Sequence, residues 1–324
     1  MKKLYIITTF ILLSNWAMSQ DPFFSQYSAS PMTLNPALVG SNMQGLNRAS
    51  FITRNQWWGG GSQPYITNTI SFERNLSSKQ SNPSNQLALG LMMLNERSNG
   101  GVLSNNYFAA ALSDQVRLSE HGVLKAAISG TYSNRMLNLA SATFQTQFGS
   151  FGFMSTASNY DPISATNSSF VELNTGLAFE HTTTDFDYEI GGAIFHASRP
   201  KQGVFNNTKY DMDPRGVGHA SLKWRPNANG EFLLSGNVQV QAKKQLVTIG
   251  GAYTVNLHDE ADHKLTVGVW DRVDESIYPY VALQVKTMKF GLSYDVVSTK
   301  VKSSFNSVSS VEASIVWDFG KVLK

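Results

Sequence analysis

The sequence predicts an all-β fold: a transmembrane antiparallel β-barrel of about fourteen strands, with an N-terminal plug or periplasmic segment. Charged residues make up only 15% of the chain, against 42% hydrophobic and 11% aromatic residues, whereas soluble domains contain about 25% charged residues. From Arg48 onward, segments of about ten residues alternate in polarity, as a barrel with lipid outside and water inside requires. After the first residues no apolar run reaches the ~20 residues of a spanning helix. The chain is therefore expected to cross a membrane as strands.

Residues 1–19 predict a cleaved secretory signal peptide. Lys2 and Lys3 precede an apolar centre, and Ala17-Met18-Ser19 has the small residues that signal peptidase prefers. An uncleaved anchor is the alternative, but the apolar centre is short for a span of ~20 residues. We expect cleavage near Ser19-Gln20 and a mature protein in the bacterial outer membrane.

Residues 20–47 predict an ordered segment that is neither a helix nor an interior strand. Pro22, Pro31 and Pro36 stand in polar and aromatic surroundings, and proline removes a backbone donor and fixes φ. Because a barrel of this size has room for an inserted segment, we expect these residues to fold into or beneath the barrel as a plug. Rapid, clean proteolytic removal of residues 20–47 from the folded protein would contradict this.

Residues 48–324 are expected to form the barrel. In Glu231–Ala242, Phe232, Leu234 and Val240 share one face, and polar residues share the other. The predicted strands are Arg48–Trp57, Tyr65–Arg74, Gln86–Asn95, Asn106–Leu118, Gly122–Ser133, Phe170–His181, Phe186–His196, Gly216–Arg225, Glu231–Ala242, Val247–Leu257, Lys264–Arg272, Ser276–Lys286, Met288–Val296 and Val311–Phe319.

Two further features concern the ends and the interior of the predicted barrel. The segment 141–169 is rich in Ser, Thr and Asn with interleaved phenylalanines, which is typical of a surface loop that covers or grips something; His121-Gly122, Thr184-Asp185, Asn229-Gly230 and Ser276 are expected to mark turns at one end. Polar residues on the inner face either line a pore or form a hydrogen-bonded scaffold against a plug: Gln239, Gln241, Gln284, Lys286, Lys289 and Asp295.

The sequence offers little support for catalysis, metals or nucleic acid. The chain has no cysteine and a net charge of only +3 without a basic run after the signal, so thiol chemistry is excluded and nucleic acid is not an expected partner. His258–His263 is compatible with a metal site but reads first as an acidic turn. His219 and Ser221 share a strand face without a third catalytic group. We expect no enzyme activity, no cofactor and no metal.

A set of motifs runs from the N-terminal block to the last strands: Asp21-Pro22-x-Phe24-Ser25-Gln26-Tyr27, Pro31, Asn35-Pro36-Ala37, Gly40, Arg54-Asn55-Gln56-Trp57, Tyr65, Thr67, Ser71-Phe72, Gly291-Leu292-Ser293-Tyr294-Asp295 and Ser298. At these residues the chain closely resembles the PorP/SprF family of outer-membrane proteins of Bacteroidetes, which are linked to type IX secretion and gliding motility. The motifs span nearly the whole mature chain.

This resemblance implies a barrel that binds the C-terminal sorting domain of a large secreted adhesin and supports its secretion and surface attachment. A second branch of the family implies contact with a periplasmic lipoprotein that binds peptidoglycan. A passive transporter is the alternative, since Asn35-Pro36-Ala37 also resembles the hatch of fatty-acid channels; it predicts a continuous apolar pocket beside the hatch.

The residues expected to contact a partner or the plug come from the two blocks around Asp21 and Arg54 that carry the resemblance. Arg54 and Gln56 are expected to face the lumen, with Arg54 paired to an acidic group, and Asn55 and Trp57 to face lipid. The full set is Asp21, Pro22, Phe24, Ser25, Gln26, Tyr27, Asn35, Pro36, Arg54, Asn55, Gln56 and Trp57.

Overall fold

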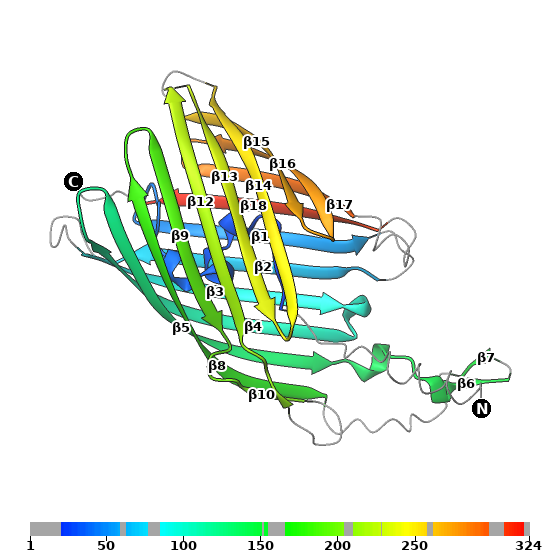
Figure 1. Cartoon of the computed structure of the whole chain (residues 1–324). Coiled ribbons are helices and arrows are strands. Elements are labelled where there is room, and N and C mark those ends of the chain that lie inside the picture. Colours follow the sequence, from blue (N-terminus) through cyan, green and yellow to red (C-terminus); the bar gives the residue numbers. More distant parts are fainter. Residues whose placement is uncertain are drawn as a thin grey trace, which may run out of the picture.

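The protein is a closed antiparallel barrel of fourteen strands, as the sequence predicts (Figure 1). The computed structural model describes residues 21–58, 63–76, 85–150, 152–154, 166–203, 210–227, 229–257, 262–297 and 308–320. The barrel strands are β1 (Asn47–Trp58), β2 (Tyr65–Asn75), β3 (Asn85–Ser98), β4 (Leu103–Arg117), β5 (Gly122–Leu137), β8 (Asn167–Thr182), β9 (Phe186–Phe195), β12 (Arg215–Asn227), β13 (Gly230–Gln241), β14 (Lys244–Asn256), β15 (His263–Arg272), β16 (Ser276–Val285), β17 (Met288–Val297) and β18 (Ser309–Phe319).

Each strand pairs with its neighbours along the chain, and β18 returns to pair with β1. The end at which β1 begins and β18 ends is called the terminal end, and the opposite end is called the loop end. The two longest connections, 138–166 and 196–214, both lie at the loop end. Outer-membrane barrels have short periplasmic turns and longer external loops, so the expected outer-membrane location predicts that the terminal end faces the periplasm.

The predicted grouping of turns is wrong at one position. His121, Thr184-Asp185 and Asn229 lie at the terminal end, but Ser276 begins β16 at the loop end. The connection before it, 273–275, is a short loop-end turn with Asp274 at φ 64°. Its length, like that of the 242–243 turn, made it indistinguishable in sequence from a periplasmic turn.

The two faces of the wall follow the alternation of the sequence. Apolar side chains such as Ile128 and Val171 are 68% and 65% exposed on the outer face, where a membrane barrel contacts lipid. Polar side chains point inward and are buried, among them Thr67, Ser113 and Lys125. Most of the inner face is therefore not exposed to water, because residues 21–46 of the chain fill much of the lumen.

The loop-end connections carry two small hairpins. β6 (Phe148–Gly149) pairs with β7 (Gly152–Phe153), and β10 (Lys201–Gln202) pairs with β11 (Tyr210–Asp211). Two short 3-10 helices, η4 (Leu139–Ser141) and η5 (Gln145–Gln147), precede the first hairpin, and η3 (Asn99–Gly101) joins β3 to β4. The β6–β7 hairpin stands well away from the barrel rim (Figure 1). The strands β5 and β8 also extend beyond their predicted limits, which shortens the expected loop.

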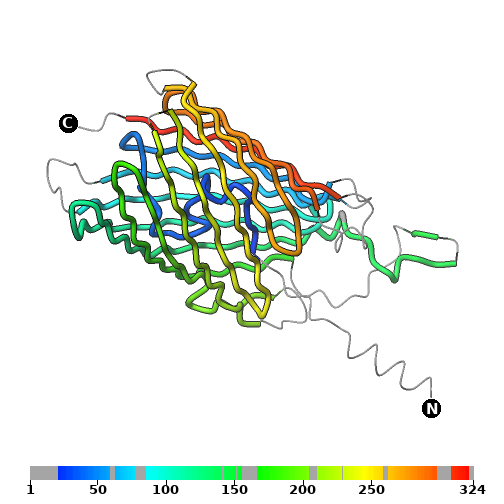
Figure 2. Tube along the Cα trace, turned by 45° about the horizontal axis from the view of Figure 1, so that its top comes forward, coloured from blue at the N-terminus to red at the C-terminus, as the bar shows by residue number. Residues whose placement is uncertain are grey.

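Residues 21–46, called the plug below, lie inside the barrel (Figure 2). They contain η1 (Tyr27–Ala29), α2 (Pro31–Leu34) and η2 (Pro36–Leu38). Pro31 and Pro36 each occupy the start of a helical turn, where a missing backbone donor costs nothing. None of the described helices is long and apolar enough to cross a membrane.

Most of the hydrophobic core lies between the plug and the side of the wall formed by β1–β9, and a smaller cluster packs Tyr27 against Ala252, Trp270 and Tyr278 of β14–β16. Leu34, Ala37 and Leu38 pack on Ala127, Ala178 and Ala193. Met32 and Val39 pack on alanines of β3 and β4, and Phe24 packs on Ile52 and Leu94. Small wall residues leave the space that the plug fills. The plug therefore follows the chain down the lumen from Asp21, near the loop end, to Leu46, at the terminal end.

Candidate functional site: the plug and its attachment to the barrel wall

The plug is attached to the wall at four levels along the barrel axis, and buried polar groups make each attachment. The first level lies nearest the loop end. Asp21 accepts a contact of 2.6 Å from Nε2 of His196 and one of 2.9 Å from Nε of Arg215. The other imidazole nitrogen of His196 contacts the carboxylate of Glu172. A histidine held between two carboxylates and an adjacent arginine form a charge-balanced clasp on the start of the plug.

The protonation states of His196 and Asp21 determine the pH range in which this attachment is stable. Burial works against a charged imidazole, but Asp21 and Glu172 outweigh it and raise the pKa of His196 to about 9. Burial would raise the pKa of Asp21, but His196 and Arg215 hold the pKa of that carboxyl below its ordinary value. A raised histidine pKa stabilises the folded state fully below pH ~6.5, and this contribution is lost as pH rises through the folded pKa.

We therefore expect the start of the plug to loosen between about pH 8 and 10. Hydrogen exchange of the amides of Asp21, Phe23 and Phe24 in the purified barrel should quicken over this range beyond the intrinsic, base-catalysed rise. A His196→Phe variant should exchange faster than the parent at pH 6 and lose the extra step above pH 8. An identical pH profile in both proteins would show that His196 does not hold the plug.

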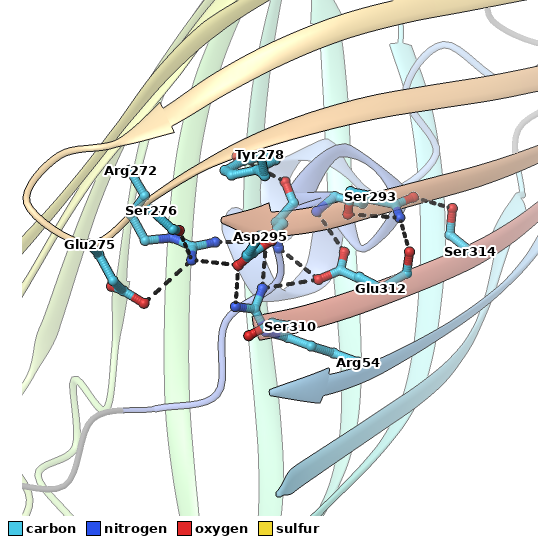
Figure 3. Close-up of polar contacts among 12 residues, drawn as sticks. Arg54, Arg272, Glu275, Ser276, Tyr278, Ser293, Asp295, Ser310, Glu312 and Ser314 are labelled. Carbon is cyan, nitrogen blue, oxygen red and sulfur yellow. Dashed lines mark hydrogen bonds and ion pairs between the residues drawn. The ribbon is translucent and has the colours of Figure 1, made fainter. Parts of the chain in front are cut away.

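The second level is a buried cluster around Ser25 and Arg54 (Figure 3). Arg54 is 1% exposed and donates to Asp295 at 2.8 Å and to Glu312 at 3.1 Å. Arg272 contacts the same Asp295 at 3.0 Å, so two arginines face two carboxylates. Register places Arg54 directly opposite Glu312 on the neighbouring strand. Four charges from β1, β15, β17 and β18 thus converge on one point of the lumen.

The plug supplies the centre of this cluster. The hydroxyl of Ser25 accepts from Arg54 at 2.5 Å and from Arg272 at 2.7 Å, and it donates to Asp295 at 2.9 Å. The backbone amides of Ser25 and Gln26 donate to the two carboxylate oxygens of Glu312, at 2.8 and 2.6 Å. Buried charges are tolerated only when they are paired and fully hydrogen-bonded, so the plug completes a network that the wall alone leaves open.

An aromatic ring of the plug covers both arginines. The guanidinium carbons of Arg54 and Arg272 lie 5.0 and 4.6 Å from the ring centroid of Phe23. Their Nε atoms are buried and have no hydrogen-bond partner among the described residues. The face of an aromatic ring attracts a guanidinium within about 6 Å, which partly offsets this loss.

The third level is Asn35, in the middle of the plug. Its amide nitrogen lies 3.0 Å from the carbonyl of Leu177, 3.2 Å from that of Gly192 and 3.0 Å from Nε2 of His219. Its side-chain oxygen caps η2 by accepting from the amide of Ala37 at 2.9 Å. A Cβ on Gly176 would stand 1.9 Å from that oxygen. The glycine therefore provides the gap into which Asn35 fits.

The fourth level lies at the terminal end. The amide of Gly40 donates to the buried carboxylate of Glu73 at 2.8 Å. The amide of Gln44 donates to Asp318 at 2.8 Å, and Asp318 also pairs with Arg48 at 2.8 Å. Gly40 has φ 77°, and a Cβ there would stand 2.4 Å from Ala88. Both the backbone angle and the close approach require glycine.

The structure brings most of the predicted site residues to the plug–wall contact. Tyr27 donates or accepts at 2.7 Å with Ser235, Phe24 is buried in the core, and Pro36 starts η2. Pro22 lines a small cavity next to Asp21. Arg54 faces the lumen and pairs with acidic groups, as predicted.

Asn55, Gln56 and Trp57 are not part of this contact in the described residues. The alternation that predicted their orientation stops at Trp57, which has φ 61° and lies in a bulge between Asn55 and Trp58. Trp58 is 60% exposed, while Trp57 packs edge-on against Tyr65 with ring centroids 5.2 Å apart. The bulge redirects the strand end, so the predicted lipid-facing position of Trp57 is not supported by the alternation rule.

The sequence reasoning missed the acidic and basic partners on distant strands: Glu73, Glu172, His196, Arg215, Arg272, Glu312 and Asp318. Asp295 was the exception, since it was expected on the inner face. Lys286, expected there too, lies exposed in the turn after β16 with φ 54°.

The geometry does not favour a catalytic or metal site in the described residues. His219 contacts Asn35 and, at 3.8 Å, Glu189, rather than Ser221. No group of three ligating side chains is placed to hold a metal ion in the part of the chain that the structure describes. Residues 258–261 of the His258–His263 segment lie outside it.

Comparison with known proteins decides the family. Residues 17–317 match the family described as Type IX secretion system membrane protein PorP/SprF. The chain belongs to this family. As a PorP/SprF protein it is an outer-membrane β-barrel of type IX secretion, and its family and fold are those of secretion and transport barrels rather than of enzymes.

Solved barrels share the PorP/SprF fold at low identity. The toluene transporter TbuX of Ralstonia pickettii is 11% identical, with 89% of this chain and 92% of that chain covered and a TM-score of 0.53. The CymD monoaromatic hydrocarbon channel is 10% identical, with 91% and 94% covered and a TM-score of 0.54. At this identity the likeness concerns the fold alone. No curated protein matches the sequence.

Proposed function

We propose that this PorP/SprF barrel binds the C-terminal sorting domain of a large type IX secreted adhesin and supports its secretion and surface attachment, as in gliding motility. The observation that carries the proposal is the fixed plug. Four attachments made by buried polar groups, three of them with charged side chains, hold it across the lumen, and such a network is suited to a permanent support rather than to an open pore. Function then falls to the surfaces at the two ends.

The loop end offers a surface that suits a protein partner. Phe148, Phe153 and Met154 of the β6–β7 hairpin are 60%, 48% and 47% exposed. The centroids of the two phenylalanine rings lie 5.3 Å apart, so the rings form one exposed apolar cluster. The hairpin projects beyond the rim (Figure 1). Exposed aromatic clusters on rigid turns are typical anchors of protein interfaces.

A passive transporter of apolar molecules has less support. It predicts a continuous apolar pocket beside the plug, whereas the cavity next to Asp21 has a volume of about 50 Å³. The larger cavities beside the plug, of about 310 and 580 Å³, are lined partly by charged side chains such as Lys289 and Arg117. Ligand pockets usually measure about 300–1,000 Å³ and are mostly apolar.

A periplasmic lipoprotein is a further proposed partner, and it would bind the opposite end. A cavity of about 580 Å³ opens between the terminal part of the plug and the wall, lined by Arg74, Arg117, Glu120 and His121 among others. Its polar rim suits a protein that approaches from the periplasm. Because the two surfaces lie at opposite ends of the barrel, both partners can bind at once.

The pull-down of tagged protein from native membranes in mild detergent tests the proposal. We expect mass spectrometry to find a very large polypeptide that ends in a type-B C-terminal sorting domain. A Phe148→Ser, Phe153→Ser double variant should reduce its recovery about tenfold or more, because truncating an interface anchor typically costs about 2 kcal/mol.

Tyr210→Ser is the matched control, since Tyr210 is also an exposed loop-end aromatic, 51% exposed in the other hairpin. It should leave recovery unchanged. Repeated recovery of the barrel alone would contradict the adhesin proposal. Equal losses in both variants would move the binding surface away from the β6–β7 hairpin.

A further inference from the structure

The plug does not fill the whole lumen. It packs on β2–β9 and contacts β15–β18 through Ser25 and Gln26, but elsewhere along the β12–β18 side a chamber of about 310 Å³ remains between plug and wall. Ser28 lines this chamber and is exposed although η1 lies inside the barrel (Figure 2). The plug therefore leaves a partly enclosed space inside the barrel, and side chains of both plug and wall line that space.

The chamber faces the terminal end. On its loop-end side, Tyr27 contacts Ser235 at 2.7 Å, Trp270 donates to the same hydroxyl at 3.2 Å, and Ser314 donates to Gln26 at 2.6 Å. On its other side it is lined by Arg48 and by the exposed Asn42. These contacts separate it from the loop end, so a ligand would enter from the periplasm.

Basic side chains without carboxylate partners line the chamber. Lys223 and Lys289 both line it, and neither has a carboxylate within 4.0 Å among the described residues. Glu189, the carboxylate that lines the chamber, is already paired with Lys125 at 2.8 Å, and Arg48 is paired with Asp318 at 2.8 Å.

The side chains around the chamber also carry more positive than negative charge close to Lys289. The charged groups with the largest electrostatic effect on Lys289 include Lys223, Arg48 and Lys264 on the positive side and Glu231 on the negative side. The Lys289 ammonium lies 5.9 Å from the ring centroid of Tyr280, and Ser221 lines the same space. Ammonium groups and hydroxyls that face one enclosed volume are the donors that carboxylate and phosphate oxygens need.

We propose that this chamber binds an oxyanion: a small molecule that carries carboxylate or phosphate groups and enters from the periplasm. Partly enclosed lysines are costly without a counter-charge, and an oxyanion between Lys223 and Lys289 would supply one. The volume lies at the lower limit of ligand pockets, about 300 Å³, which fits a small organic anion. The inference does not depend on the adhesin, because it concerns the opposite side of the plug.

Citrate and inorganic phosphate are suitable probes for the full-length protein in detergent micelles, each titrated by calorimetry at constant ionic strength. We expect saturable binding of at least one probe. At saturation, the acetylation of Lys289 and Lys223, quantified by mass spectrometry, should fall about fivefold or more, because a bound oxyanion occupies the ammonium groups. Lys244, exposed at the loop end, should react unchanged. Binding of citrate alone would indicate a preference for carboxylate groups, and binding of phosphate alone a preference for phosphate groups.

Lys289→Met should weaken binding about tenfold or more, since it removes a charge-assisted contact, whereas Lys244→Met should not. Heat-dependent migration on gels verifies that each variant is folded. If Lys289→Met does not fold, Lys223→Met tests in its place whether the lysines of the chamber bind the oxyanion. Three results would overturn the proposal: no saturable binding of either probe, equal binding by the folded lysine variant and the parent, or equal protection of Lys244.

Discussion

Arg54→Met is expected to lower the free energy of unfolding of the barrel by about 3–5 kcal/mol, because it leaves two buried carboxylates without their shared cation. Glu312 would keep only the amides of Ser25 and Gln26, and Asp295 would keep Arg272 and the Ser25 hydroxyl. Unfolding in urea, followed by the heat-dependent gel shift of the folded barrel, measures the change. The loss should appear together with faster proteolysis of the plug.

Two variants separate this effect from a general loss of charge. Arg97→Met removes an exposed arginine near the same end of the barrel and should change stability by less than about 0.5 kcal/mol. Adding Glu312→Gln to Arg54→Met should recover part of the loss, since it removes one uncompensated charge. If Arg54→Met and Arg97→Met unfold at the same urea concentration, the buried cluster does not stabilise the plug.

The barrel was predictable because each strand carries its own signal. In β13 and β17, lipid on one side and a polar lumen on the other impose a period of two that local sequence shows directly. The strand count was confirmed for that reason. Strand ends were less predictable, since the bulge at Trp57 and the positive φ of Lys286 depend on local geometry that no alternation reveals.

The site was only half predictable for a different reason. The plug residues stand together in the chain, so Ser25, Asn35 and their neighbours could be selected as a block. Their partners come from strands up to 288 residues away, and inward-facing polar residues look alike in every strand. A carboxylate or arginine on an inner face was the available signal, and it separates Asp295 and Glu312 from the serines and threonines around them.

Gly176→Ala is expected to dislodge the middle of the plug. The new Cβ would stand 1.9 Å from the side-chain oxygen of Asn35 and 3.2 Å from Pro36, so one of them must move. Overpacking of this kind typically costs about 1–3 kcal/mol, and moving Asn35 also gives up its contacts with Leu177 and Gly192. Limited proteolysis should then cleave residues 21–46, and planar-bilayer recordings should show larger and more frequent conductance steps.

The double variant identifies the clash, because Asn35→Ala removes the oxygen that the new Cβ would meet. Gly176→Ala with Asn35→Ala should destabilise the plug less than the sum of the two single changes. Gly130→Ala is the matched control: Gly130 lies on the adjacent strand β5, and a Cβ there meets nothing within 4 Å. If the two changes are strictly additive, the loss of stability does not come from a clash between the new Cβ and Asn35. If they are sub-additive, position 176 is a glycine because the plug needs its missing side chain as the space that Asn35 occupies.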